Sequence, residues 1–172
     1  MTGGPAQTHT RTWRKRALPE EHPRPDPDGA AVILYTGAQV LLQKRDHRPR
    51  RFPGRWALFG GGIQPGEDPE FSACRELQEE LGIHLLPRDL EPLGRFQVIG
   101  TVNDPVVHFF RAPLTVGFWD LLLALSQSSK LDLEGEGVAL FTHEEVDYLH
   151  LRCHDRIALE RHFQGSRFGF ID

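Results

Sequence analysis

Three glutamates, Glu76, Glu79 and Glu80, lie close together in a segment with a helical pattern. At about 100° per residue, their side chains fall within an arc of roughly 100° on one side of a helix. Like charges at these spacings repel one another. A hard divalent cation removes that repulsion and prefers oxygen ligands, so the pattern favours Mg²⁺ or Mn²⁺ shared with substrate phosphates. Taken alone, the helix is explained equally well by a solvated acidic face.

The helix that carries the glutamates is predicted to run from Pro69 to Leu81. Asp68 stands at the N-cap position, Pro69 at the first helical position and Gly82 at the left-handed C-cap. The side opposite the glutamates is apolar and is expected to be buried. It consists of Phe71, Ala73, Cys74, Leu77 and Leu81.

A run of glycines, Gly60-Gly61-Gly62, comes shortly before this helix and is expected to interrupt regular structure. Glycines let the backbone approach a phosphate or a metal closely, and a helix N-terminus favours anions. A glycine-rich loop alone is more often merely a turn. Together with the carboxylate helix it predicts a phosphate site, with Gly61 and Gly62 against the substrate.

The 23 residues from Gly61 to Ile83 resemble the signature of the Nudix hydrolases, G-x5-E-x7-R-E-U-x-E-E-x-G-U, where U is aliphatic. Every specified position is met, by Gly61, Glu67, Arg75, Glu76, Leu77, Glu79, Glu80, Gly82 and Ile83. The resemblance implies an α/β fold, a Nudix-type α/β/α sandwich with a mixed β-sheet. It also implies a hydrolase of MutT-like type that cleaves a nucleoside diphosphate linked to another group.

The same resemblance implies a role for each charged residue that the signature specifies. Glu79 and Glu80 correspond to direct ligands of Mg²⁺ or Mn²⁺, and Glu76 joins them when substrate is bound. The backbone carbonyl of Gly60 is a further candidate ligand. Arg75 and Glu67 correspond to a pair that orients the catalytic carboxylates, which is close to what a plain salt bridge would do.

Three candidates lie outside the signature. Arg45, after the strand predicted over residues 39–44, matches a family position that often reaches the substrate, although an isolated arginine there is more often a solvated charge. Glu134 and Glu136 are candidates for the general base or an extra metal ligand, because many relatives use a glutamate from a later loop. The alternative is a pair of exposed loop carboxylates.

The remaining segments predict strands interleaved with a few helices, a mixed α/β sandwich. Residues 30–35 and 39–44 read as a hairpin, and 56–59, 94–99, 106–112 and 137–141 as further strands. Residues 117–126 are apolar on every side, which fits helix or strand. Thr142 and Glu145 form a capping box, and residues 156–162 indicate a C-terminal helix.

Composition bounds the remaining expectations. The chain has 172 residues and a formal charge of −4, with 13 prolines. One domain over residues 29–172 follows a Pro- and Arg-rich N-terminal tail, 1–28, predicted to be flexible. The acidic balance and short apolar runs argue against nucleic acid and membrane partners and favour a cytoplasmic protein. The apolar segment 118–123 is expected to lie in the core. The alternative is that it forms a homodimer interface.

The sequence therefore predicts a metal-dependent pyrophosphohydrolase of a small nucleotide, such as a nucleoside triphosphate or a nucleotide sugar. A catalytically silent nucleotide-binding sensor on the same scaffold is the alternative. Silent relatives usually lose signature carboxylates, and none is lost here. An RNA 5′-end pyrophosphohydrolase is the least favoured reading because of the acidic balance.

Overall fold

The computed structural model describes residues 28–46, 52–99, 104–127 and 135–165. The expected tail, residues 1–28, lies outside these ranges except for its last residue. The strands are β1 (Gly29–Thr36), β2 (Gln39–Arg45), β3 (Trp56–Ala57), β4 (Phe59–Gly62), β5 (Glu91–Gln97), β6 (Val106–Pro113) and β7 (Gly135–Thr142). The helices are α1 (Pro69–Leu81), α2 (Phe118–Gln127), α3 (His143–Val146) and α4 (Cys153–Phe163), with a 3₁₀ turn, η1, at Pro87–Asp89.

The described strands form one mixed sheet. Its central order is β3-β2-β1-β6-β5, with β4 paired to β1 and β7 paired to β2. β1 and β6 run parallel, and the other pairs are antiparallel. β4 and β2 share one edge of β1, because β4 pairs with residues 29–32 and β2 with residues 34–36.

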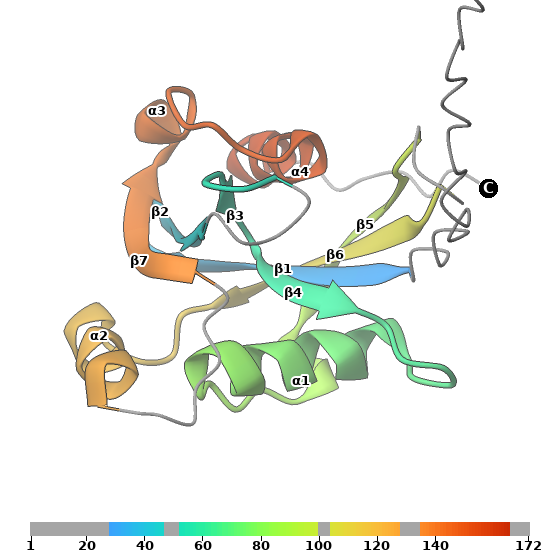
Figure 1. Ribbon diagram of the computed structural model, residues 1–172, viewed down its shortest axis with the longest axis horizontal. Coiled ribbons are helices and arrows are strands. Elements are labelled where there is room, and N and C mark those ends of the chain that lie inside the picture. Colours follow the sequence, from blue (N-terminus) through green and yellow to red (C-terminus); the bar gives the residue numbers. More distant parts are fainter. Residues whose placement is uncertain (1–27, 47–51, 100–103, 128–134, 166–172) are drawn as a thin grey trace, which may run out of the picture.

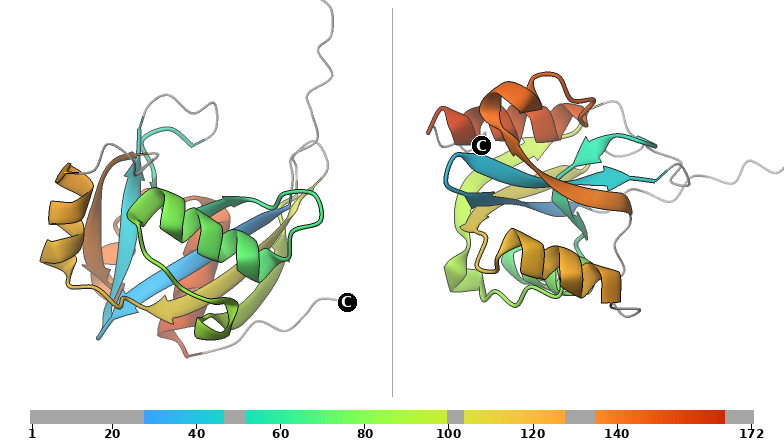
Figure 2. Two further views of the ribbon diagram at one scale, coloured as in Figure 1. Left: turned by 90° about the horizontal axis from the view of Figure 1, so that it is seen from below. Right: turned by 90° about the vertical axis from the view of Figure 1, so that its left-hand side faces the viewer.

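Helices cover both faces of the sheet (Figure 1). Strand side chains alternate, so Val32 and Leu34 of β1 pack toward α1 and α2, whereas Ile33 packs toward α3 and α4. The right-hand view of Figure 2 shows α3 and α4 on one side of the sheet and α1 and α2 on the other. The expected α/β/α sandwich with a mixed sheet is confirmed.

Helix α1 has the predicted bounds, Pro69–Leu81. Gly82 ends it with a left-handed φ of 68°, as predicted. Asp68 has the extended backbone of an N-cap, but its side chain makes no capping hydrogen bond. The expected buried side is only partly right, because Phe71 is exposed while Leu77 and Leu81 are buried.

The glycine run does not interrupt the sheet, contrary to the expectation. Gly60, Gly61 and Gly62 form most of β4 and pair with Ala31, Ala30 and Gly29 of β1. Gly60 has a φ of 140°, and a Cβ there would collide with the carbonyl oxygen of Ala30. The glycines therefore allow a close strand pairing, which a sequence reading takes for a loop.

Other boundaries differ in smaller ways. The strand expected over 56–59 is split into β3 and β4. The strand expected over 94–99 is β5, Glu91–Gln97. Its early start was not predicted, because Pro92 and a bulge between Pro92 and Gly94 are untypical of a regular strand. The ambiguous segment 117–126 is helix α2, and the Thr142–Glu145 capping box is confirmed. None of the helices in the four described ranges is long and apolar enough to cross a membrane.

Candidate metal and phosphate site

Arg75 is the centre of the site. Its Nε and Nη2 donate to the two oxygens of Glu67 at 2.9 and 3.0 Å. Its Nη1 donates to Glu76 at 2.7 Å and to Glu79, one helical turn further on, at 3.4 Å. One guanidinium thus holds three of the predicted carboxylates in fixed positions at the surface of α1.

This network lowers the pKa of Glu67 to about 2, mainly through the hydrogen bonds from Arg75 and then through the backbone N–H of Gln64. The same hydrogen bonds raise the pKa of Arg75. Glu67 and Arg75 therefore stay charged across the neutral range. Three carboxylates face one guanidinium, so the cluster keeps an excess of negative charge, which attracts a cation.

Glu80 lies apart from this network and is only 3% exposed. Its Oε1 accepts from Nε2 of Gln43, and its Oε2 accepts from the backbone N–H of Gly60, both at 3.3 Å. The expectation that all three glutamates share a solvated side is wrong for Glu80. It lies at the border of the helix's apolar side, and the close approach of β4 covers it.

Glu76 rests on the glycine strand. A Cβ on Gly61 would lie 2.5 Å from the Oε1 of Glu76, so a larger residue would displace this carboxylate from its place beside Arg75. The carbonyl of Gly62 accepts from Arg75 at 3.1 Å and from Ser72 Oγ at 3.4 Å. Gly61 and Gly62 thus make room for and orient charged side chains of α1, and Ser72 is a contributor that sequence reasoning missed.

Residues 25–159 match the NUDIX domain family. The chain belongs to this family. The MutT NUDIX hydrolase of Burkholderia pseudomallei is 27% identical, over 79% of this chain and 97% of that one, with a TM-score of 0.59. A mutT/nudix family protein from Listeria innocua is 25% identical, over 82% of this chain and 95% of that one, with a TM-score of 0.60.

A curated relative shares a shorter segment. The nucleoside triphosphatase NudI of Escherichia coli O9:H4 (strain HS) is 48% identical over 61 residues, 36% of this chain and 43% of that protein. The match thus spans less than half the length of this relative. The likeness to this relative is therefore limited to that segment.

The donor set of this Nudix site fits a hard cation. Carboxylates and backbone carbonyls supply only oxygen, and Gly61 leaves the space beside Glu76 that a Cβ would fill. Within the described ranges, no group of three His, Cys, Asp or Glu side chains is already arranged to hold a metal ion. Such a site suits Mg²⁺, which keeps several waters and takes further ligands from substrate phosphates.

Arg45 and Glu136, two of the candidates outside the Nudix signature, are neighbours in the pairing of β2 with β7. Lys44 pairs with Gly137 and Arg45 with Gly135, so Glu136 is the extra residue of a bulge in β7 beside Arg45. A bulge re-aims a side chain and is common next to active sites. Gly135 makes this approach feasible, since a Cβ there would collide with the carbonyl of Lys44. Glu134 lies outside the described residues.

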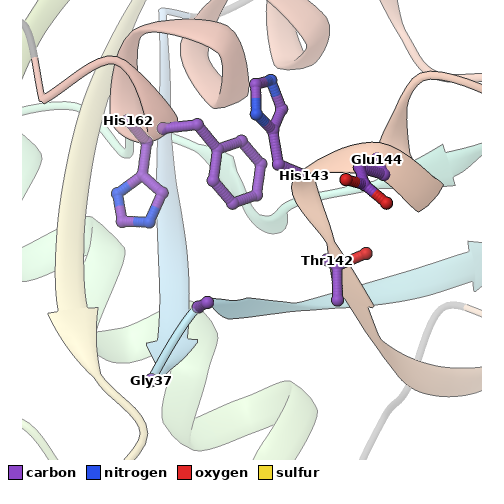
Figure 3. A pocket seen from close by; sticks show the side chains of 7 residues that line it. Gly37, Thr142, His143, Glu144 and His162 are labelled. Carbon is purple, nitrogen blue, oxygen red and sulfur yellow. The ribbon is translucent and has the colours of Figure 1, made fainter.

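A cavity of about 530 Å³ lies at the tip of the β1–β2 hairpin, where it is lined by Gly37, the start of α3 and the end of α4 (Figure 3). Arg45 ends β2 at the opposite end from this turn. None of the lining residues belongs to the Arg75 network. The cavity is thus separate from the Nudix site.

Proposed function

We propose that this Nudix protein is a divalent-metal-dependent hydrolase that cleaves the pyrophosphate bond of a nucleoside diphosphate-linked small nucleotide. The observation that carries the proposal is the cluster of Glu67, Glu76 and Glu79 around Arg75, with Glu80 fixed against Gly60. The name of one relative, a nucleoside triphosphatase, supports a nucleoside triphosphate as substrate, and a nucleotide sugar is the second candidate.

In the proposed mechanism, bound Mg²⁺ or Mn²⁺ would neutralise phosphate charge and lower the pKa of a bound water. Glu79, whose side chain is 54% exposed, is the ligand most accessible to an incoming complex. Glu80 offers oxygens whose orientation the protein has already fixed. Arg75 keeps Glu76 and Glu79 from moving apart under their mutual repulsion.

Two further roles belong to the proposal. Glu136, exposed on β7, is the described candidate for the base that takes a proton from the attacking water, and Glu134 is its neighbour along the chain. Arg45, at the end of β2, is proposed to contact a substrate phosphate. General-base assistance of this kind contributes about 10²–10⁴-fold in rate, so Glu136→Gln should lower turnover within that range.

A cytoplasmic location and a homodimer remain predictions. Trp119 and Leu123, respectively 79% and 55% exposed on α2, are the residues of the segment 118–123 that would face a second copy. Light scattering after size exclusion tests this, with Trp119→Ser as the matched variant. A monomer at all concentrations would contradict the dimer and leave the hydrolase proposal unchanged.

The test of function is product analysis by mass over a panel of nucleoside triphosphates, nucleotide sugars, dinucleoside polyphosphates and coenzyme A. Each compound is incubated with Mg²⁺, with Mn²⁺ and with EDTA. The proposal predicts cleavage of one class in the presence of metal and none with EDTA. A capped or triphosphorylated RNA is added to test the RNA 5′-end alternative.

If no compound of the panel is cleaved and a nucleotide binds tightly, the hydrolase proposal is contradicted and the nucleotide-binding sensor is favoured. Cleavage that persists in EDTA would contradict metal dependence. Selective cleavage of the RNA, with binding that weakens steeply as salt rises, would favour RNA 5′ ends as substrates.

A further inference from the structure

A chain of buried polar groups crosses the sheet from α4 to α1. It begins at Asp155, which is fully buried and accepts from Nε and Nη2 of Arg152 at 2.6 and 3.1 Å. Asp155 also accepts from the backbone N–H of Leu58 at 3.2 Å, and Arg152 Nη2 donates to the carbonyl of Leu58 at 3.4 Å. Side chains at the start of α4 therefore hydrogen-bond both the N–H and the carbonyl of Leu58.

Leu58 needs these partners because of its position. It lies between β3, which pairs with β2, and β4, which pairs with β1. In Figure 1 the chain passes here from β3, beside α4, to β4, above α1. Leu58 itself is fully buried and belongs to neither strand. Buried backbone groups outside a ladder must be satisfied by side chains or water.

The chain of contacts continues on the α1 face through Gln43. This side chain is fully buried, and its Nε2 donates to the carbonyl of Leu58 at 3.4 Å and to Glu80 Oε1 at 3.3 Å. Glu80 Oε2 accepts from Gly60, two residues beyond Leu58. One oxygen of Glu80 is therefore linked to Leu58 through Gln43, and the other is bonded directly to Gly60. Asp155 of α4 and the preceding Arg152 bind Leu58 from the other face.

We propose that Gln43 and the Arg152–Asp155 pair are positioning residues that fix the orientation of the Glu80 carboxylate for metal binding. The inference rests on the proposed function in taking Glu80 as a metal ligand. It extends the site to α4, through Leu58. A buried carboxylate needs hydrogen bonds in place of its hydration, and those supplied here leave it one orientation.

The test is direct Mn²⁺ binding, measured as loss of the free-ion electron paramagnetic resonance signal, with no substrate present. Gln43→Met keeps the length and volume of the side chain and removes the amide. It is expected to weaken Mn²⁺ binding about 10-fold, in the range found for groups that orient metal ligands. Arg152→Lys keeps a cation beside Asp155 and loses the fork that reaches Leu58, so it should weaken binding in the same direction but less.

The control is Leu159→Ala, which removes a fully buried side chain of α4 that belongs to the packing cluster on that face. It should lower the melting temperature at least as much as Gln43→Met and leave Mn²⁺ affinity unchanged. The double variant Gln43→Met/Arg152→Lys should bind Mn²⁺ more tightly than the product of the two single effects predicts, because Arg152 reaches Glu80 through Leu58 and Gln43, and Gln43→Met already breaks that route.

The outcomes separate this inference from the proposed function. If Glu80→Gln weakens Mn²⁺ binding while Gln43→Met binds like the wild type, the positioning role is wrong and the metal site stands. If Leu159→Ala weakens binding as much as Gln43→Met, the effect is structural and the inference is overturned. If Glu80→Gln binds Mn²⁺ like the wild type, the assignment of Glu80 as ligand fails and the inference fails with it.

Discussion

Two arginine–carboxylate clusters lie on opposite faces of the sheet and use the same chemistry for different ends. Arg75, on α1, faces three carboxylates and stays partly exposed, so the cluster keeps excess negative charge. Arg152, the residue just before α4, faces the single, fully buried Asp155 of that helix, and the pair is balanced. His154 also lies beside Asp155. Because burial lowers the pKa of His154, this histidine adds no second positive charge to the pair at neutral pH.

The two clusters differ in charge balance and in exposure, which is why the Arg75 cluster is the one proposed to bind a metal. An excess of partly exposed carboxylates is favourable only when a cation joins it, whereas a balanced buried pair is complete as it stands. In this protein the balanced Arg152–Asp155 pair is connected through Leu58 and Gln43 to Glu80, which lies on α1 with the Arg75 cluster. The comparison can be tested at each arginine.

The largest stability effect is expected at α4. Arg152→Met leaves Asp155 buried without its guanidinium, and breaking a buried pair from one side costs about 3–5 kcal/mol of unfolding free energy. Urea unfolding measures the loss. Arg156→Met, on the same helix, removes only a hydrogen bond to the carbonyl of Leu149 and should cost about 1.5–3 kcal/mol. Equal losses would contradict the special position of the Arg152 pair.

At α1 the corresponding change should affect activity more than stability. Arg75→Met frees Glu67, Glu76 and Glu79 from their common partner, and groups that orient metal ligands contribute about 10–100-fold in affinity or rate. The measurement is kcat/KM for the substrate found in the panel. Arg88→Met, at an exposed site in η1, is the control. Unchanged turnover in Arg75→Met would remove the arginine from the site.

The Arg75 cluster also predicts a pH dependence of stability. Glu67 has a pKa near 2 in the folded protein against an ordinary value of 4.5. Its contribution is therefore fully present above about pH 5 and is lost as the pH falls toward 2. Glu67→Gln should flatten the fall in unfolding free energy across this window, measured by urea titration at several pH values. Parallel profiles for the two proteins would contradict the prediction.

A third ion pair, Arg111 and Glu91, is expected to contribute least to the free energy of unfolding. They are cross-strand partners on β6 and β5, bidentate at 2.8 Å, and both are partly exposed. Exposed pairs contribute about 0–1 kcal/mol because water screens them. Glu91→Gln should therefore change the unfolding free energy by no more than this. A loss as large as that of Arg152→Met would mean that exposure does not separate the pairs.

Local features of the sequence predicted much of the fold. The bounds of α1, its left-handed Gly82 and the Thr142–Glu145 capping box follow from residues within one or two turns of one another. The Nudix signature likewise brings Glu67 to Arg75 because only seven residues separate them along a loop and a helix. Such features depend on the local chain and need no knowledge of its neighbours.

What the sequence did not predict depends on contacts between distant segments. A helical projection gives the angle of Glu80 and says nothing of β4, which covers it. Gln43 meets Glu80 across 37 residues, and Leu58 meets Asp155 across 97. The one available signal was a glutamine following the apolar residues of β2, and a buried polar side chain in a strand calls for a partner.

The central claim is that the carboxylates of α1 perform metal-dependent hydrolysis, and Glu80→Gln tests it most directly. The measurement is Mg²⁺-dependent turnover of the cleaved compound, compared with Glu70→Gln, the same change on the same helix outside the Arg75 network. Glu80→Gln is expected to lose at least about 10²-fold in turnover, with circular dichroism of the variant checking that it is folded, and Glu70→Gln is expected to turn over like the wild type. Wild-type turnover in Glu80→Gln would contradict the central claim.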